Sequence, residues 1–132
     1  MKLEHAALWT PDLERARTFY AHYFGGQAGP RYANPNHGFA SYFLTFDGGS
    51  RLELMQMPGI VPRATPPETQ VMGLVHLAFT PGDEGAVDAL TKRLRADGYP
   101  VIREAYRTGD GYYESTVLDP DGNRIEIAAL PA

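Results

Sequence analysis

The sequence contains one short unit twice, and this repeat constrains the fold more than any other feature. The segment Gly-Ser-Arg-Leu-Glu-Leu, which holds Glu53, recurs as Gly-Asn-Arg-Ile-Glu-Ile, which holds Glu126. His5 precedes the first glutamate by 48 residues, and His76 precedes the second by 50. Each copy thus contributes one histidine and one glutamate at matching positions. Two imidazoles and two carboxylates placed by an internal repeat are a typical ligand set of a divalent metal site.

The length of the chain, 132 residues, is that of one ordinary domain. We predict a single domain over residues 1–132, in which repeat one covers 1–57, a proline-rich linker covers 58–72 and repeat two covers 73–132. The sequence has no cysteine, which excludes disulfides, thiolate metal ligands and a cysteine nucleophile. Metal ligands therefore have to come from His, Asp, Glu or backbone groups.

The charge pattern argues against nucleic acid as a partner. The net charge is -4 at pH 7, so the chain lacks the basic footprint that would neutralise phosphates. No stretch approaches the roughly 20 consecutive apolar residues of a membrane span, and the N-terminal residues read as a strand rather than a signal peptide. We expect a cytoplasmic protein whose partner is a small molecule.

Repeat one is predicted to begin with a strand over residues 2–10. Thr10 is then expected to cap a helix that Pro11 begins, since serine or threonine caps and first-turn prolines are common at helix starts. After a glycine stop and a loop, a hairpin completes the repeat, with its strands at 39–46 and 51–57.

Repeat two is predicted to follow the same order: a strand at 73–80, a helix at 83–97, a short strand near Val101, and strands at 113–118 and 124–129. Each half is therefore β-α-β-β-β, with the metal candidates on its first and last strands. We predict an α+β fold in which the two repeats form a cupped mixed sheet with helices on its outer face. A half this small cannot cover both faces of its own sheet, so pairing with its twin, in the chain or in a homodimer, is expected.

The glutamates of the repeat are predicted to point away from the packed layer. Side chains alternate along a strand, so Ile125 and Ile127 face the core while Glu126 faces the opposite side. Glu53 lies between two leucines in the same way. A half-buried carboxylate is unfavourable unless a cation or hydrogen bonds neutralise it. A single strand histidine or glutamate is more often structural than a metal ligand, but four at repeat-equivalent positions are not independent, and together they favour metal.

The element order, both histidines and the hairpin Asp-Pro-Asp-Gly-Asn-Arg-Ile-Glu-Ile resemble the vicinal oxygen chelate superfamily, which has the glyoxalase/bleomycin resistance/dioxygenase fold. The resemblance covers essentially the entire chain. The ligand pattern His5, Glu53, His76 and Glu126 is most similar to the glyoxalase I branch. This resemblance implies a divalent metal ion, Zn, Ni, Mn or Co, with positions left open for two substrate oxygens.

The same resemblance implies an isomerisation of the lactoylglutathione lyase type. In that reaction the metal polarises the oxygens of a hemithioacetal while a ligand glutamate moves a proton between adjacent carbons. Carried over by position, Glu126 is the primary base, and Glu53 is the facing ligand and a possible second base.

The glutathione-binding positions of that branch differ in this chain. Glyoxalase I enzymes have an arginine four residues after the first histidine and an asparagine four residues after the first glutamate, where this chain has Trp9 and Met57. Neither side chain can form the charge-assisted hydrogen bonds that a free carboxylate requires. We expect them to bind an apolar or aromatic ligand, or else to pack against the sheet. Two further residues are candidates for substrate binding. Tyr42 is a candidate if its register matches Glu53, and is otherwise a core aromatic residue. Arg107 is a candidate or else a solvated charge in a loop.

Other reactions of the superfamily remain as alternatives. Extradiol dioxygenases and fosfomycin-type thiol transferases use three protein ligands, so the second carboxylate, Glu53, argues against both. A coenzyme A epimerase would usually have glutamine at that position. A binding protein of the bleomycin-resistance type would sequester a small molecule without converting it, and those relatives lack the metal ligands found here.

Overall fold

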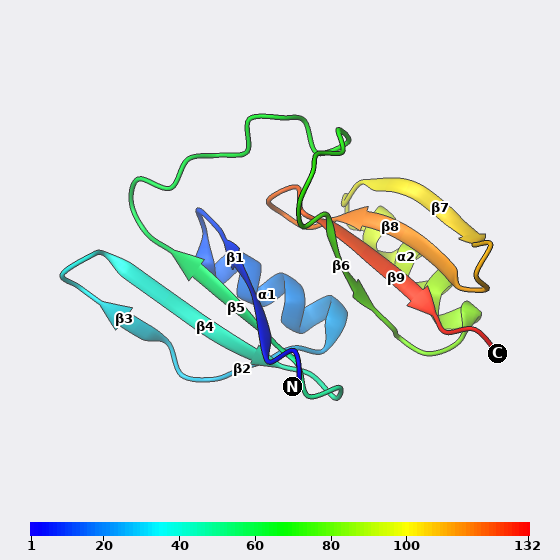
Figure 1. The fold of residues 1–132 in the computed structure, drawn as a ribbon, viewed down its shortest axis with the longest axis horizontal. Helices are drawn as coiled ribbons and strands as arrows, with labels where there is room; N and C mark the ends of the chain where they lie inside the picture. Colours follow the sequence, from blue (N-terminus) through cyan, green and yellow to red (C-terminus); the bar gives the residue numbers. More distant parts are fainter. The chain divides into compact units, whose positions relative to one another are not determined.

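The computed structural model describes all residues, 1–132, and the chain divides into two compact units, Met1–Arg63 and Ala64–Ala132 (Figure 1). Each unit has its own sheet and one helix that packs on one face of that sheet. The boundary between the units lies inside the predicted linker. Neither helix is long and apolar enough to cross a membrane.

The first unit is a five-stranded mixed sheet with the helix α1, Leu13–Phe24. Its strands run in the order β1-β5-β4-β2, and β3 also pairs with β4. β1 is parallel to β5, and the other pairs are antiparallel. The strands are β1 (His5–Trp9), β2 (Gln27–Ala28), β3 (Tyr32–Asn34), β4 (Phe39–Thr45) and β5 (Arg51–Gln56).

The second unit is a four-stranded mixed sheet with the helix α2, Glu84–Ala96. Its strands run in the order β6-β9-β8-β7, with β6 parallel to β9. The strands are β6 (His76–Phe79), β7 (Val101–Arg107), β8 (Tyr113–Leu118) and β9 (Arg124–Ala129). The predicted α+β class and the strand-helix-strand order of both repeats are thus confirmed.

Both helices begin at an aspartate that caps them through its side chain. Asp12 accepts a hydrogen bond from the backbone N–H of Arg15 at 3.0 Å, and Asp83 accepts one from Ala86 at 2.9 Å. The predicted cap at Thr10 and helix start at Pro11 are therefore wrong. An aspartate oxygen satisfies an N–H of the first turn that would otherwise lack a hydrogen-bond partner. Asp12 has the right spacing for this cap, because it lies three residues before Arg15.

The strand predictions were incomplete in two places. β2 and β3 lie where a loop was expected, and β7 extends over seven residues where only a short strand near Val101 was predicted. β2 and β3 have two and three residues, too few to show an alternating pattern.

Each helix covers the apolar face of its own sheet. The buried apolar side chains of the first unit include those of Phe19 and Tyr20 on α1 and of Leu44, Leu52 and Leu54 on the strands. In the second unit they include those of Val87, Leu94, Val117, Ile125 and Ile127. Leu54 and Ile127 each follow the glutamate of the repeat, so the glutamates point to the opposite face of each sheet.

The turn before β9 explains why the motif Asp-Pro-Asp-Gly-Asn precedes Glu126. The buried carboxylate of Asp119 accepts hydrogen bonds from the backbone N–H groups of Asp121 and Asn123, at 2.9 and 2.8 Å, and from the side-chain amide of Asn123 at 2.8 Å. Gly122 has φ +80°, a conformation that favours glycine. The motif therefore builds a tight turn and fixes where β9 begins.

Candidate metal-binding and active site

The first unit brings His5 and Glu53 together on the sheet face opposite α1. In the parallel pair β1–β5, Ala7 lies beside Glu53 and His5 lies beside Arg51. His5 is therefore the diagonal neighbour of Glu53 on the same face. The Nε2 atom of His5 lies 3.8 Å from Oε2 of Glu53.

The second unit repeats this arrangement in its parallel pair β6–β9. Ala78 lies beside Glu126 and His76 lies beside Arg124, which is the same register as in the first unit. The Nε2 atom of His76 lies 3.1 Å from Oε2 of Glu126. Both glutamates are largely shielded, with side chains 17% and 20% exposed, whereas both histidines are about twice as accessible.

Each pair offers one imidazole nitrogen and one carboxylate oxygen, a donor set that suits Zn, Ni, Mn or Co. In each unit the histidine Nε2 is a basic atom within 4 Å of the glutamate carboxylate. No group of three or more His, Cys, Asp or Glu side chains lies close enough together to hold a metal ion. Each unit by itself therefore provides two of the four predicted ligands.

The first pair has Glu4, Phe43 and Arg51 as close neighbours. The Nδ1 atom of His5 contacts the Glu4 carboxylate, and its ring meets the ring of Phe43 edge to face with centroids 5.2 Å apart. Phe43 is the cross-strand partner of Glu53 on β4. The guanidinium of Arg51 lies over the Phe43 ring, 4.1 Å from its centroid, and also binds Glu4. The hydrogen bond with His5, followed by that with Arg51, holds the pKa of Glu4 below its usual range.

The surroundings of the second pair are open. Thr116 is the cross-strand partner of Glu126, so a small polar side chain stands where the first unit has Phe43. A cavity of about 300 Å³ lies beside the pair. Its lining residues come from the sheet and from the segment before β6: Glu68, Gln70, Val75, His76, Ile102, Arg103, Thr116, Arg124 and Glu126.

The carboxyl group of Glu126 titrates abnormally in this setting. Burial raises its pKa above the ordinary value, and Glu114 adds to the rise, while His76 and Arg103 act in the opposite direction. A raised pKa in a cavity is a common property of groups that accept and return protons.

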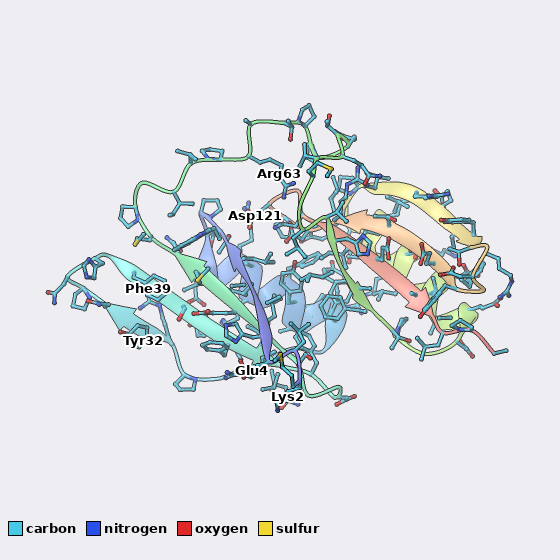
Figure 2. All side chains as sticks on the ribbon, in the orientation of Figure 1. Lys2, Glu4, Tyr32, Phe39, Arg63 and Asp121 are labelled. Atoms are coloured by element: carbon cyan, nitrogen blue, oxygen red, sulfur yellow. The ribbon has the colours of Figure 1, made fainter.

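Trp9 lies on the same sheet face as His5, two residues beyond Ala7. Its ring meets the ring of Phe39 edge to face, with centroids 6.2 Å apart. Tyr32 lies near Phe39 on the neighbouring strand (Figure 2), with ring centroids 6.0 Å apart. Trp9 is 40% exposed, so it is not simply part of the core. Met57 follows the last residue of β5 and is half-buried.

The structure places Tyr42 and Arg107 away from the two pairs. Phe43, not Tyr42, pairs with Glu53, so the register condition for Tyr42 is not met, and its hydroxyl donates a hydrogen bond of 2.7 Å to Glu14 on α1. Arg107 pairs in register with Tyr113, and its guanidinium contacts Glu84 at the start of α2. Both side chains therefore contact the helix of their own unit.

Sequence reasoning did not find the side chains that distinguish the two pairs, namely Glu4, Phe43, Arg51, Arg103 and Thr116. One signal was available. Glu4 directly precedes the first histidine, and an acidic residue beside a candidate metal-binding histidine is a common partner for the second ring nitrogen. The positions of Phe43, Arg51, Arg103 and Thr116 depend on the register between neighbouring strands, which the sequence does not give directly.

The family model of the Glyoxalase/Bleomycin resistance protein/Dioxygenase superfamily matches residues 2–127 of this chain. The chain belongs to this superfamily. The resemblance inferred from the repeat is therefore confirmed at the level of the family.

Individual relatives are more distant. An uncharacterised protein of Bacillus subtilis, YqjT, is 29% identical over 135 residues, which cover 96% of this chain and 98% of that protein. The mitochondrial methylmalonyl-CoA epimerase of Bos taurus is 36% identical over 58 residues, which cover 44% of this chain and 33% of the epimerase. The solved structure of the trypanothione-dependent glyoxalase I of Leishmania major has the same fold, with a TM-score of 0.75 and 21% identity over 98% of this chain and 86% of that one.

Proposed function

We propose that this protein is a metal-dependent enzyme of the glyoxalase type, which isomerises a small substrate with adjacent oxygens by moving a proton between neighbouring carbons. The observation that carries the proposal is the repeated pair. In both units a histidine Nε2 and a glutamate oxygen lie within 4 Å of each other, at identical register, on the sheet face that the helix leaves free.

The donors fit a divalent metal. Two imidazoles and two carboxylates form a mixed nitrogen and oxygen set, and the carboxylates are shielded enough to favour a cation beside them. We propose His5, Glu53, His76 and Glu126 as the ligands of Zn, Ni, Mn or Co. When bound, such an ion would polarise a substrate oxygen and stabilise negative charge there.

The four ligands have different tasks in this proposal. Glu126 acts as the principal base, because its carboxylate lines the cavity and can reach a proton of a molecule bound there. Glu53 serves as the facing ligand and as a possible second base. Each unit supplies two ligands, so a four-ligand site needs one first unit and one second unit, either from one chain or from two chains. We propose a homodimer as the functional assembly.

The substrate is proposed to carry an apolar or aromatic group instead of glutathione. Trp9 occupies the position of the arginine that glyoxalase I enzymes use for the glutathione carboxylate, and Met57 occupies that of the asparagine. The exposed indole of Trp9 and the neighbouring ring of Phe39 offer the edge and face contacts that aromatic groups prefer. The likeness to glyoxalase I of Leishmania major supports the fold alone, so it gives no substrate.

The test begins with elemental analysis of the purified protein, followed by an assay with hemithioacetals made from several thiols. About one Zn, Ni, Mn or Co per pair of units, with isomerisation of at least one aryl or alkyl hemithioacetal, is the expected result. Glu126→Gln should keep the fold and much of the metal but lower kcat by about 10²- to 10⁴-fold, the usual contribution of a general base. Full activity in this variant contradicts the assigned base.

A second candidate reaction is epimerisation of a carbon acid, favoured by the local similarity to methylmalonyl-CoA epimerase. An epimerase also removes and returns a proton, so Glu126 would serve as its base, while Glu53 stands where such epimerases usually have glutamine. Exchange of a substrate proton with deuterium from solvent, tested with an acyl-coenzyme A, distinguishes this reaction from hemithioacetal isomerisation. Tight binding of a ligand that is recovered unchanged would instead indicate a binding protein.

A further inference from the structure

The Glu4 carboxylate connects the first histidine to an arginine. Glu4 lies directly before β1 (Figure 2). One carboxylate oxygen contacts Nδ1 of His5, and the other accepts a hydrogen bond of 2.7 Å from Nε of Arg51. Because an ionised carboxylate only accepts hydrogen bonds, the Nδ1 atom of His5 has to be the donor. In the neutral imidazole the Nε2 atom, which lies 3.8 Å from Glu53, is then the nitrogen with a free lone pair.

The backbone holds Glu4 in place as well. The backbone N–H of Arg51 donates to the carbonyl oxygen of Glu4 at 2.9 Å, and the Ser50 hydroxyl donates to the carbonyl of Leu3 at 2.9 Å. Both the main chain and the side chain of Glu4 are therefore fixed on the start of β5. The position of the carboxylate is set by the same strand pair that aligns His5 with Glu53.

Phe43 is a second restraint on the histidine, whose side chain is still 39% exposed. Its ring packs edge to face against His5 and also lies under the Arg51 guanidinium. The imidazole is thus restrained through Nδ1 by Glu4 and through its ring by Phe43. The Nε2 atom faces Glu53, the other proposed ligand of this unit.

The second unit has no such arrangement. The residue before His76 is Val75, which has no carboxylate. Arg124 holds the same register position as Arg51, but it donates a hydrogen bond of 2.7 Å to the backbone carbonyl of Glu68. The two histidines therefore differ in how they are oriented, although their strands match.

We propose that Glu4 is a positioning residue: it selects the Nδ1–H tautomer of His5 and presents Nε2 as the ligating nitrogen. The proposal rests on the proposed function for its metal, but the tautomer belongs to the metal-free protein. Carboxylates that accept the second N–H of a ligating histidine are common in metal sites, and their loss usually lowers metal affinity about 10- to 100-fold.

The first test uses the metal-free protein at about pH 8.5, roughly two units above the ordinary pKa of histidine. Long-range ¹H–¹⁵N correlation spectra report which ring nitrogen of each histidine carries the proton. His5 should show the Nδ1–H form in the wild type and lose this preference in Glu4→Ala. His76 should not change. Glu14→Ala is the matched control, because Glu14 is another exposed carboxylate of the first unit that accepts bonds from an arginine and a second side chain.

The second test measures Zn²⁺ affinity by competition with a chelator. Glu4→Ala should bind Zn²⁺ about 10- to 100-fold more weakly than the wild type, and Glu14→Ala should bind as the wild type does. The melting temperature of metal-free Glu4→Ala should stay close to that of the control, since Glu4 is exposed. A lower melting temperature with an unchanged His5 tautomer would show a merely structural role and overturn the proposal.

The two readouts separate this proposal from the proposed function. If the wild type binds no Zn²⁺ but His5 holds the Nδ1–H form only when Glu4 is present, the metal assignment fails and the positioning role stands. If Zn²⁺ binds equally well to the wild type and Glu4→Ala and the tautomer is the same in both, the positioning role is wrong and the metal site stands.

Discussion

In the first unit two neighbouring side chains hold the histidine, and in the second unit the glutamate lines a cavity. His5 is held by Glu4 and Phe43, whereas Glu126 lines a cavity of about 300 Å³. The backbone register around both pairs is the same. The difference therefore comes from the side chains on the neighbouring strands, above all from phenylalanine in one unit and threonine in the other.

This contrast shows how a duplicated unit can divide two tasks. A repeat supplies matching backbone positions, so each copy presents one histidine and one glutamate in the same geometry. A binding site also needs rigid support for its metal ligands and free volume for the substrate. One copy cannot provide both at the same place. In the proposed function both units contribute metal ligands, the first with a restrained histidine, and the cavity of the second unit also accommodates the reacting part of the substrate.

Substitutions in the helix-facing cores of the two units should destabilise the protein equally. They should also have the largest effect of the changes considered. Leu54 and Ile127 follow the repeat glutamates, and both side chains are fully buried. Leu54→Ala and Ile127→Ala should each lower the free energy of unfolding by about 2–5 kcal/mol, because each leaves a cavity in a packed core. Urea denaturation measures both values. A loss below about 1 kcal/mol in only one variant would mean that the two cores are not equivalent.

Removing either proposed histidine ligand should weaken metal binding strongly. His5→Ala and His76→Ala should each lower Zn²⁺ affinity by a hundredfold or more, about 2.7 kcal/mol, since a direct ligand contributes at least as much as its supporting partners. Metal content after dialysis and chelator competition provide the measurement. His37→Ala, in the loop between β3 and β4, should bind Zn²⁺ like the wild type, and equal affinity in all variants would make the histidines structural.

Exchanging the cross-strand neighbours tests the division of tasks directly. Thr116→Phe places the aromatic ring of the first unit into the cavity of the second and should lower kcat/KM by about 10- to 100-fold without loss of metal, because the substrate loses space. Phe43→Thr should mainly weaken Zn²⁺ binding, since it frees His5 and Arg51. Steady-state kinetics and metal analysis of both variants decide the matter, and unchanged turnover in Thr116→Phe would exclude this cavity as the substrate site.

The sequence predicted the parts of the fold that have strong local signals. Strands 113–118 and 124–129 were predicted with the bounds that the structure has, because a tight Asp-Pro-Asp-Gly turn separates two alternating runs. The extent of β7 was missed because charged residues such as Arg103 and Glu104 interrupt its apolar pattern on an exposed edge. Edge strands gain their bonds from a neighbour and need little apolar pattern of their own.

The candidate site was predictable only in part, for the same reason. Alternation along β5 and β9 placed Glu53 and Glu126 opposite the core, and the repeat pointed to their histidines. The difference between the units depends on which residue of β4 or β8 stands opposite each glutamate. That register is set by the turns between strands, and a shift of one residue would have brought Tyr42 to the position of Phe43.

The abnormal titration of Glu126 gives the smallest expected effect. Burial raises the pKa of this carboxyl in the metal-free protein. The folded state therefore holds the proton more tightly than the unfolded chain, so this stabilisation is complete below the ordinary carboxyl pKa and is lost as the pH rises through the folded pKa. Metal-free Glu126→Gln should then be more stable than the wild type at pH 8, with the difference shrinking towards pH 4. Thermal unfolding at both pH values measures this, with Glu14→Gln as the exposed control.

A wild type as stable as the variant at pH 8 would show that the open cavity hydrates Glu126 fully, and the contrast between the units would then rest on packing alone.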